Sequence, residues 1–268
     1  MKQKLLLWLF SLLSATGVHA QVAYCMVTDT DGNGSKETLT FKYDNNMPAS
    51  DAWTFNQYWQ LSLDQDVKDA ITHAVFDTSF SNARPTSCTS WFSGMQNLEK
   101  IDNLGSLNTS EVTSMSSMFQ GCEKLQSLDL SGFDTSKTTE MGLMFYGCSS
   151  LKTLDLSNFD IQKCNYFYSV FKNCSSLKSV NISTLDLKSS TLTSLFSGCE
   201  ALEFVDMSHV KLSYNPNTSY YYNDYPFSGC TNLLCIDMSE AITTGGTAKR
   251  NSGLFCQVPK NTIIYLPS

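Results

Sequence analysis

The sequence predicts an α/β solenoid in which each repeat of about 26 residues adds one short strand and one short helix. Two observations support this prediction. One phrase, opened by a phenylalanine, recurs at spacings of 25 to 31 residues, and apolar residues alternate within it as they do in a strand. The phrase begins at Phe92, Phe119, Phe145, Phe171, Phe196 and Phe227, and Phe255 opens a shorter closing unit. About six repeats and a terminal partial unit therefore fill residues 91–268.

Regularly spaced apolar residues mark the strand of a repeat. In the second repeat they are Leu125, Leu128 and Leu130, an L-x-x-L-x-L pattern whose last two members point to one face of a strand. A single repeat cannot bury its own apolar face, so stacked neighbours must bury theirs mutually. Each large side chain buried in this way contributes about 1.5–3 kcal/mol. These leucines are therefore expected in the core.

The helix of each repeat is inferred from the segment that leads to the next strand. Asp134-Thr135-Ser136 offers oxygens that can cap a helix N-terminus. Met141, Met144 and Phe145 follow at the i, i+3, i+4 spacing of one helix face. A short helix is therefore expected to return the chain to the next strand.

The repeated phrase M-F-x-G-C-x-x-L-x-x-L-D-L-S-x-F-D-T-S, seen at residues 118–136, resembles the repeat of BspA-like leucine-rich-repeat surface proteins. The resemblance covers about residues 70–268, with departures such as Asn173 at the glycine position and Met95 at the cysteine position. It implies a leucine-rich-repeat solenoid and a cell-surface or secreted protein of host-associated microbes. Some relatives are linked to adhesion to host proteins or to other cells. The resemblance implies no reaction.

Residues 1–20 are predicted to be a secretory signal peptide that is removed. Lys2 and Lys4 precede an apolar run at 5–10, and Val18-His19-Ala20 supplies small residues at the positions that a signal peptidase reads. The run is too short to span a membrane, and the bulky Tyr24 before the first cysteine argues against a lipid anchor. The mature chain is therefore expected to be exported to the cell surface or the extracellular space, with the periplasm as an alternative, and to have no transmembrane span.

Residues 21–90 are predicted to form a small β-rich segment that caps the first repeat. Strand candidates at 24–27 and 39–43 flank a turn-rich stretch at 29–34, so a hairpin is expected. The segment contains large aromatic side chains that can form its own apolar core, at Trp53, Phe55, Tyr58 and Trp59. A terminal repeat needs such a cap because one of its faces has no neighbouring repeat.

The predicted hairpin turn also matches the first half of a calcium-binding loop. Asp29, Asp31, Asn33 and Gly34 occupy its first, third, fifth and sixth positions. Position twelve is Thr40 instead of a glutamate, and the flanking segments are strand candidates where the motif has helices. A plain turn is therefore the preferred interpretation and weak calcium binding stays open. No metal site or cofactor is predicted.

Five of the ten cysteines occupy one repeated position. They are Cys122, Cys148, Cys174, Cys199 and Cys230. A small apolar thiol suits a tight buried turn, so free buried thiols are favoured, although a rung spacing of roughly 5 Å also permits disulfides. Cys235 and Cys256 lie one repeat apart near the C-terminus and are a candidate bridge that the sequence leaves undecided.

The candidate ligand face consists of strand positions that alternate with the buried ones and therefore point outward. The acidic column runs through Asp102, Asp129, Asp155, Asn181, Asp206 and Asp237, and the serine column through Ser131, Ser157, Ser183, Ser208 and Ser239. Stacked carboxylates repel, so some of their pKa values should rise, and the face should attract cations or basic segments of a partner. Alternatively, these side chains only keep the sheet soluble and bond to neighbouring backbone or to water.

A second candidate site is an aromatic patch in the fifth repeat, which is lengthened to 31 residues. The patch contains Tyr220, Tyr221, Tyr222 and Tyr225. Tyrosine gives a large amphipathic contact area at low entropic cost, which suits a binding surface. The alternative is that these rings pack on the neighbouring coils.

Together these features predict an exported, non-enzymatic protein that binds an extracellular protein or glycan. A carbohydrate-binding module and a structural envelope protein are the alternatives. His73 and His209 are the histidines of the mature chain, neither in an H-E-x-x-H pattern, and an evenly spaced acidic column marks no unique catalytic pair. The net charge of −7 makes nucleic acid a poor partner.

Overall fold

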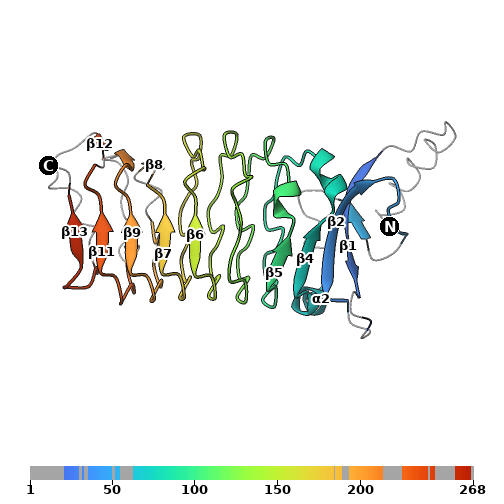
Figure 1. Ribbon diagram of the computed structural model, residues 1–268, viewed down its shortest axis with the longest axis horizontal. Coiled ribbons are helices and arrows are strands. Elements are labelled where there is room, and N and C mark those ends of the chain that lie inside the picture. Colours follow the sequence, from blue (N-terminus) through green and yellow to red (C-terminus); the bar gives the residue numbers. More distant parts are fainter. Residues whose placement is uncertain are drawn as a thin grey trace.

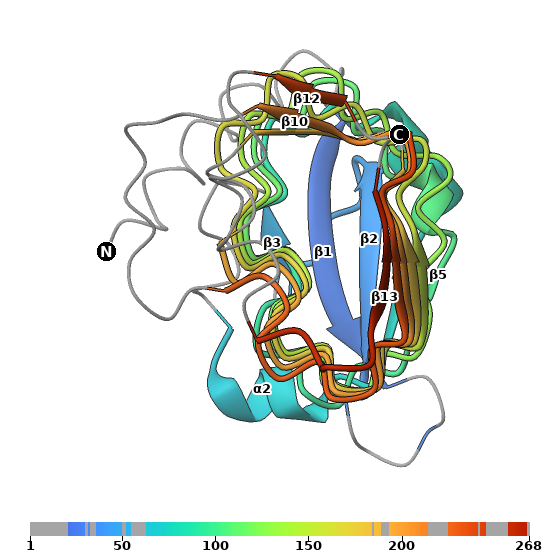
Figure 2. The same cartoon turned by 90° about the vertical axis from the view of Figure 1, so that its left-hand side faces the viewer.

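The chain winds into a β-solenoid of about six coils, closed at its N-terminal end by a small sheet (Figure 1). The computed structural model describes residues 21–29, 32, 36–49, 52–54, 63–183, 185–188, 193–213, 225–240, 242–244 and 257–266. Viewed along its axis, the coils superimpose (Figure 2), so equivalent residues of successive repeats lie above one another. The signal peptide predicted for residues 1–20 lies outside the described residues.

The N-terminal sheet contains the predicted hairpin. Strands β1 (Val22–Thr28) and β2 (Thr38–Asp44) pair antiparallel, and β3 (Ala52–Thr54) pairs antiparallel with the other side of β1. Strand β4 (His73–Phe76) then pairs parallel with β2, and β5 (Lys100–Asp102) pairs parallel with β4. The sheet order β3-β1-β2-β4-β5 therefore leads from the hairpin directly into the first coil.

Three short helical elements lie around this sheet. The α-helix α2 (Gln65–Ala70) precedes β4, the 3-10 helix η3 (Thr78–Asn82) follows it, and the 3-10 helix η4 (Leu104–Ser106) follows β5. Within the described residues, α2 is the only α-helix.

An aromatic cluster joins this N-terminal sheet to the first coil. The ring of Phe41 stacks on Phe76 with centroids 4.3 Å apart and on Trp91 at 5.6 Å, and Phe80 meets Phe41 edge-on. All four side chains are buried. Large stacked rings bury much apolar area, so the cluster seals the first face of the core.

Each later coil contributes one strand to a parallel sheet of order β13-β11-β9-β7-β6. The strands are β6 (Thr153–Asp155), β7 (Ser179–Asn181), β9 (Phe204–Asp206), β11 (Cys235–Asp237) and β13 (Ile263–Tyr265). A second parallel sheet contains β8 (Asp186–Lys188), β10 (Lys211–Ser213) and β12 (Ile242–Thr244). The second repeat forms no strand at 127–129, although its leucines enter the core as expected.

Within the described residues the predicted helix of each repeat is not found, and overlapping turns return the chain to the next strand instead. In the segment that starts at Met141, the N–H groups of Leu143 and Phe145 donate to carbonyls of the next coil, at Tyr168 and Val170. The alternate N–H groups donate three residues back, as from Met144 to Met141 at 3.2 Å. Alternate backbone N–H groups of this segment therefore bond to the neighbouring coil. In an α-helix the same groups would bond within the helix, to carbonyls four residues back. The described repeats are therefore β-solenoid coils and not strand–helix units.

These turns explain the glycine of the repeated phrase. Gly147 has a φ of 72°, in the left-handed region that is open to glycine at no steric cost. The fourth repeat places Asn173 there, with a φ of 62°. Asparagine is among the few other residues that tolerate this conformation, so its departure from the phrase leaves the turn intact.

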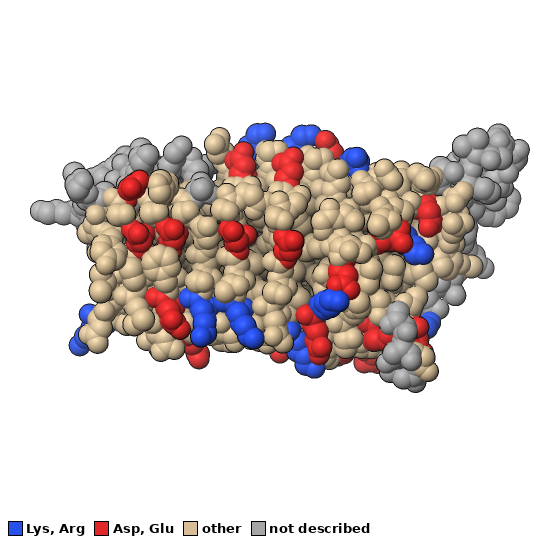
Figure 3. Space-filling view, viewed as in Figure 1, with Lys and Arg blue, Asp and Glu red and all other residues tan. Residues whose placement is uncertain are grey.

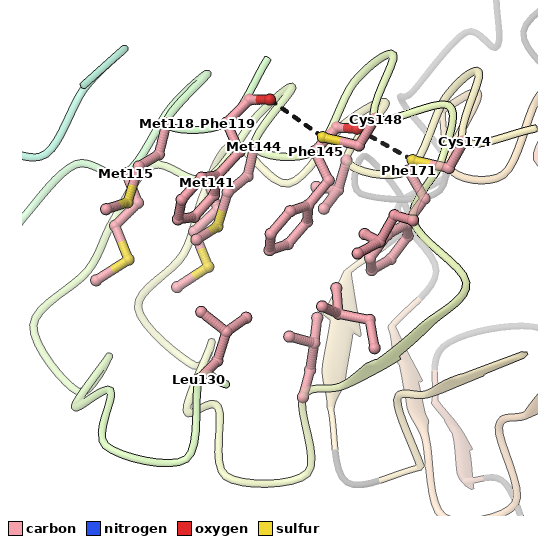
Figure 4. Close-up of a cluster of buried hydrophobic side chains, with 14 of the residues drawn as sticks. Met115, Met118, Phe119, Leu130, Met141, Met144, Phe145, Cys148, Phe171 and Cys174 are labelled. Carbon is pink, nitrogen blue, oxygen red and sulfur yellow. Dashed lines mark hydrogen bonds between the residues drawn. The ribbon is translucent and has the colours of Figure 1, made fainter. Parts of the chain in front are cut away.

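The core is built from columns of identical side chains, of which phenylalanine forms the longest (Figure 4). Consecutive rings from Phe92 to Phe227 stack with centroids 5.1–5.9 Å apart and planes within 11° of parallel. A shorter column pairs Phe133 with Phe159 at 6.4 Å. The residues at helical spacing, Met141 and Met144, are fully buried beside the phenylalanines, so the predicted core is correct even where the helix is not.

The repeated cysteines form a second column inside the turns. Each thiol donates to the phenylalanine carbonyl of the preceding coil, as Cys148 does to Phe119 at 3.1 Å and Cys174 to Phe145 at 3.0 Å (Figure 4). All five are buried free thiols, the interpretation that the sequence favoured. Burial raises the pKa of these thiols, for Cys230 to about 12. Cys256 lies outside the described residues, so its bridge to Cys235 stays a prediction.

Buried threonines join the coils on another side. The hydroxyl of Thr135 donates to the carbonyl of Asp160 at 3.1 Å and accepts from the N–H of Asp160 at 2.7 Å. Thr109 makes the same pair of bonds with Asp134. A buried hydroxyl that uses both its donor and its acceptor costs little to desolvate, so the F-D-T-S end of the phrase holds neighbouring coils in register.

We predict that Phe145→Ala lowers the free energy of unfolding by about 3–5 kcal/mol, because it leaves a cavity between two stacked rings. Phe227→Ala should cost less, because within the described residues Phe227 stacks on one phenylalanine ring only. Urea denaturation followed by circular dichroism measures both. Equal losses would contradict the view that stability accumulates from contacts between neighbouring coils.

We also predict that the five cysteines of the column resist alkylation in the folded protein, because burial disfavours the reactive thiolate. All five should react after denaturation without a reductant. Peptide mapping by mass spectrometry distinguishes the states. Cysteines that label only after reduction would show that this column contains disulfides.

Candidate binding face

The predicted acidic column lies on the outward side of the parallel sheet. Asp155 is in register with Asn181, Asn181 with Asp206, and Asp206 with Asp237. Neighbouring strands lie about 4.8 Å apart, so these side chains form one row. Figure 3 shows acidic side chains in a row along this side, in the same view as Figure 1. The structure therefore brings the predicted residues of the candidate face together.

The row is held in place by hydrogen bonds from the serine column. Ser131 donates to Asp129 Oδ1 through its backbone N–H at 3.0 Å and through its hydroxyl at 2.6 Å. Ser208 makes the same two bonds to Asp206, at 3.0 and 2.7 Å. The N–H groups of Ser157 and Ser239 donate to the preceding aspartates at 2.9 Å. Each aspartate thus closes the turn after its strand, as aspartate and asparagine commonly do.

These bonds overturn the expectation that some pKa values in the row would rise. The hydrogen bonds from Ser131 lower the pKa of Asp129, and those from Ser239 lower that of Asp237. A hydrogen bond to a carboxylate favours its charged form, and at both residues this effect outweighs the opposing effect of desolvation. The aspartates therefore bond to neighbouring backbone, which is one part of the alternative stated for the sequence, and a ligand-binding role of the face stays a prediction.

Asp102, at the N-terminal end of the row, has different partners. Lys100 Nζ donates to it at 2.8 Å, and His73 Nε2 lies 2.9 Å from its Oδ2. These two groups help to lower the pKa of Asp102, the hydrogen bond from Lys100 most of all. The row is therefore partly neutralised at this end.

Two exposed lysines form a feature of this side that the sequence reasoning missed. Lys152 and Lys178 stand just before β6 and β7, and Figure 3 shows lysines gathered below the acidic row. Lys178 lies 3.8 Å from Glu203, and Lys152 donates to Gln126 at 3.2 Å. The sequence pattern that could have predicted them is a lysine three residues before the Asp or Asn of the row, which occurs in two successive repeats. The face therefore carries both signs of charge, with Lys178 beside Glu203 below the acidic row.

The candidate aromatic patch is not assembled in the described residues. Tyr220, Tyr221 and Tyr222 lie outside them, and Tyr225 is half-buried. The structure exposes a different pair, Tyr166 and Tyr168, on another side of the coils. A Cβ atom added to Gly142 would lie 2.8 Å from the Tyr168 ring, so the ring lies directly against that glycine.

One cluster on this side has the composition of a hydrolytic triad. His209 Nδ1 lies 2.9 Å from Ser208 Oγ, and His209 Nε2 lies 3.0 Å from Glu240 Oε2. The Ser208 hydroxyl, however, donates to Asp206, so its proton is not directed to the histidine. His209 and Glu240 are also more than 60 % exposed, whereas catalytic groups act in water-excluded sites. The cluster is a surface network.

The predicted turn at Asp29–Gly34 is described in part. Gly32 N–H donates to Asp29 Oδ1 at 2.7 Å, as in an ordinary turn, while Asp31, Asn33 and Gly34 lie outside the described residues. In the part of the chain that the structure describes, no group of three His, Cys, Asp or Glu side chains is placed to hold a metal ion. None of the described helices has the length and apolar character needed to cross a membrane.

Two families match the sequence over the coils. The family described as "Mycoplasma protein of unknown function, DUF285" matches residues 86–208, and the one described as "BspA type Leucine rich repeat region (6 copies)" matches residues 169–254. No curated protein matches the chain.

Among solved structures, the chain is similar to a leucine-rich-repeat protein of T. pallidum (TpLRR). The identity is 16 % and the TM-score 0.44, over 77 % of this chain and 91 % of that one. The family matches lie on the same coils that carry the repeated phrase. The comparisons therefore support a BspA-like leucine-rich-repeat family for this chain, with the family match over residues 169–254.

Proposed function

We propose that the protein is an exported, non-enzymatic binding protein that holds a partner protein at or beyond the cell surface through the outward side of its parallel sheet. The observation that carries this proposal is the in-register row of aspartates. Serine hydrogen bonds already fix these side chains, so a partner would not have to order them on binding. The family supports the proposal, because leucine-rich repeats generally serve as binding scaffolds.

The partner that suits this face is a protein with a basic segment. The hydrogen bonds engage Oδ1 of each aspartate, and for Asp129 no bond within the described residues engages Oδ2. A lysine or arginine of the partner can approach that oxygen. Because the charges are exposed, the attraction should be sensitive to salt and should mainly raise specificity and the rate of association.

Export is the second element of the proposal. It rests on the sequence of residues 1–20 and on the surface association typical of BspA-type proteins. The buried free thiols agree with it, because a thiol shielded in the core is protected in an oxidising environment.

A glycan-binding module is the second candidate function. The exposed Tyr166 and Tyr168 favour it, since tyrosine rings can stack on sugar rings. Glycan binding through these rings should tolerate salt, and this distinguishes it from binding through the acidic row.

Binding to extracellular-matrix proteins, mucins and glycans at low and high salt tests the proposal, with Asp129→Asn/Asp155→Asn as the variant. Asparagine preserves the turn, because Asn181 Oδ1 already accepts the same two bonds from Ser183. We expect the variant to lose about tenfold in affinity for a protein ligand that wild type binds in a salt-sensitive manner.

The matched control is Asp134→Asn/Asp160→Asn. It makes the same change in charge, and both residues accept the equivalent turn bonds, from Ser136 and Gln162 at 3.0 Å. These residues lie beyond the turn that ends the sheet, in the segment equivalent to β8. Equal losses in the two variants would mean that net charge alone is responsible. Salt-tolerant glycan binding lost in Tyr166→Ala/Tyr168→Ala would favour the second candidate, and no binding at low salt would favour a structural role.

A separate prediction concerns the N-terminus. Expressed with its native start, the protein should be recovered outside the cytoplasm with Gln21 as its first residue, because cleavage follows Ala20. Intact-mass spectrometry of the fractionated cells checks this. Protein that still begins with Met1 and remains in the cytoplasm would refute export.

A further inference from the structure

We propose that a second copy of this chain docks on the last coil, with the two β13 strands (Ile263–Tyr265) paired antiparallel across a twofold axis. This inference does not rest on the proposed function, because it is argued from the outermost described strand of the sheet and not from the acidic row. It arises from a change in surface chemistry along the sheet.

The outward side of the sheet turns apolar at its C-terminal end. In β6 and β7 the outward residues are polar, namely Thr153, Asp155, Ser179 and Asn181. In and beside β13, Ile263, Tyr265 and Leu266 are 57 %, 52 % and 60 % exposed. Contiguous exposed apolar side chains commonly mark a protein interface.

The backbone of β13 is open to a further strand. Within the described residues, β13 is the edge of its sheet. Ile263 N–H donates to Leu234 at 2.8 Å, and the Tyr265 carbonyl accepts from Met238 at 2.9 Å, so the backbone groups of both residues face β11. Because these groups alternate in direction along a strand, the N–H and C=O of Ile264 face the open edge. An edge of this kind is a template for another strand.

The inward side chain of the last coil is also less well covered than its counterparts. Leu154, Val180, Val205 and Ile236 occupy the middle strand position in earlier coils, and each is at most 5 % exposed. Ile264, at the same position in β13, packs on the core but is only partly buried. The last coil therefore has apolar surface that a further layer would cover.

A second copy suits this edge better than a charged peptide. With Ile264 on the twofold axis, the two Ile264 residues would exchange a pair of backbone hydrogen bonds. Ile263 would then oppose Tyr265 of the second copy, a favourable pairing of an aromatic with a β-branched side chain. Residues 262–266 carry no charge, so two copies with a net charge of −7 can meet here without placing like charges in contact.

Sedimentation equilibrium of the purified protein tests the proposal, with Ile263→Lys/Tyr265→Lys as the edge variant. We expect wild type to form dimers in the micromolar range and the edge variant to associate at least about tenfold more weakly, because lysines at an edge prevent pairing. Phe204→Lys/Leu234→Lys is the control on the same side away from the edge and should still dimerise. A monomeric wild type, or a control that dissociates while the edge variant does not, would overturn the proposal.

Disulfide trapping tests the register, in a Cys235→Ser/Cys256→Ser background. These changes remove the cysteine in register with Ile263 and the cysteine nearest to it in sequence. In the proposed pairing, positions 263 and 265 of opposite copies are directly opposed with Cα atoms about 4.5 Å apart, within disulfide range. A mixture of Ile263→Cys and Tyr265→Cys chains should cross-link on mild oxidation, and Ile263→Cys alone should not. Equal cross-linking of Ile263→Cys alone would refute the antiparallel register, and no cross-linking in the mixture would refute the interface.

Discussion

The structure depends on one constraint, which is that the backbone of each coil must hydrogen-bond to the backbone of the next. The turn segments meet it by directing alternate N–H groups, such as those of Leu143 and Phe145, to the following coil. The chain can do this only if successive coils follow the same path, so the near-constant repeat length is a geometric requirement. At the position before the repeated cysteine the path needs a positive φ. Glycine recurs there, and Asn173 replaces it with a φ of 62° where Gly147 has 72°.

Because successive coils follow the same path, residues at the same position of the repeat form a column. Within a column, one kind of interaction is repeated from coil to coil. Phenylalanines stack almost parallel, thiols donate to carbonyls one coil back, and threonine hydroxyls join neighbouring turns. The aspartate row arises in the same way, because each aspartate first serves to close a turn. Asn181 shows that an amide meets this structural need without charge. A charge at this position is therefore not required by the fold.

The sequence was sufficient to predict the solenoid, the buried columns and the outward row. In a repeated strand, alternate residues point to opposite faces, so the alternation of apolar and polar residues indicates which side chains are buried. It was not sufficient to predict the connection between strands. Met141, Met144, Phe145 and Cys148 bury one face at helical spacing, but consecutive turns that bond three residues back produce the same spacing. Which carbonyl an N–H meets depends on the neighbouring coil, and no single repeat contains that information.

The electrostatic error at the site has a similar origin. Repulsion within the aspartate row was inferable from register alone, whereas the bond from Ser131 that lowers the pKa of Asp129 depends on the local turn. Contacts between side chains of different repeats could not be predicted from the sequence either. The contact of Lys178 with Glu203, and that of Gly142 with the Tyr168 ring, join different repeats. The repeated phrase predicts which residues form columns. The contacts at the surface depend on residues that are not shared by all repeats.

The first and the last described coil share one physical problem, because within the described residues each has another coil on one side only. At the N-terminal end, β2 covers β4, and Phe41 stacks on Phe76 so that both are fully buried. At the C-terminal end of the described residues, the outermost strand is β13, with apolar side chains facing solvent and Ile264 only partly covered. At the first coil, the N-terminal sheet and its aromatic cluster cover the apolar side chains that a neighbouring coil would otherwise cover. That asymmetry, and not the acidic row, distinguishes the last coil from all the others.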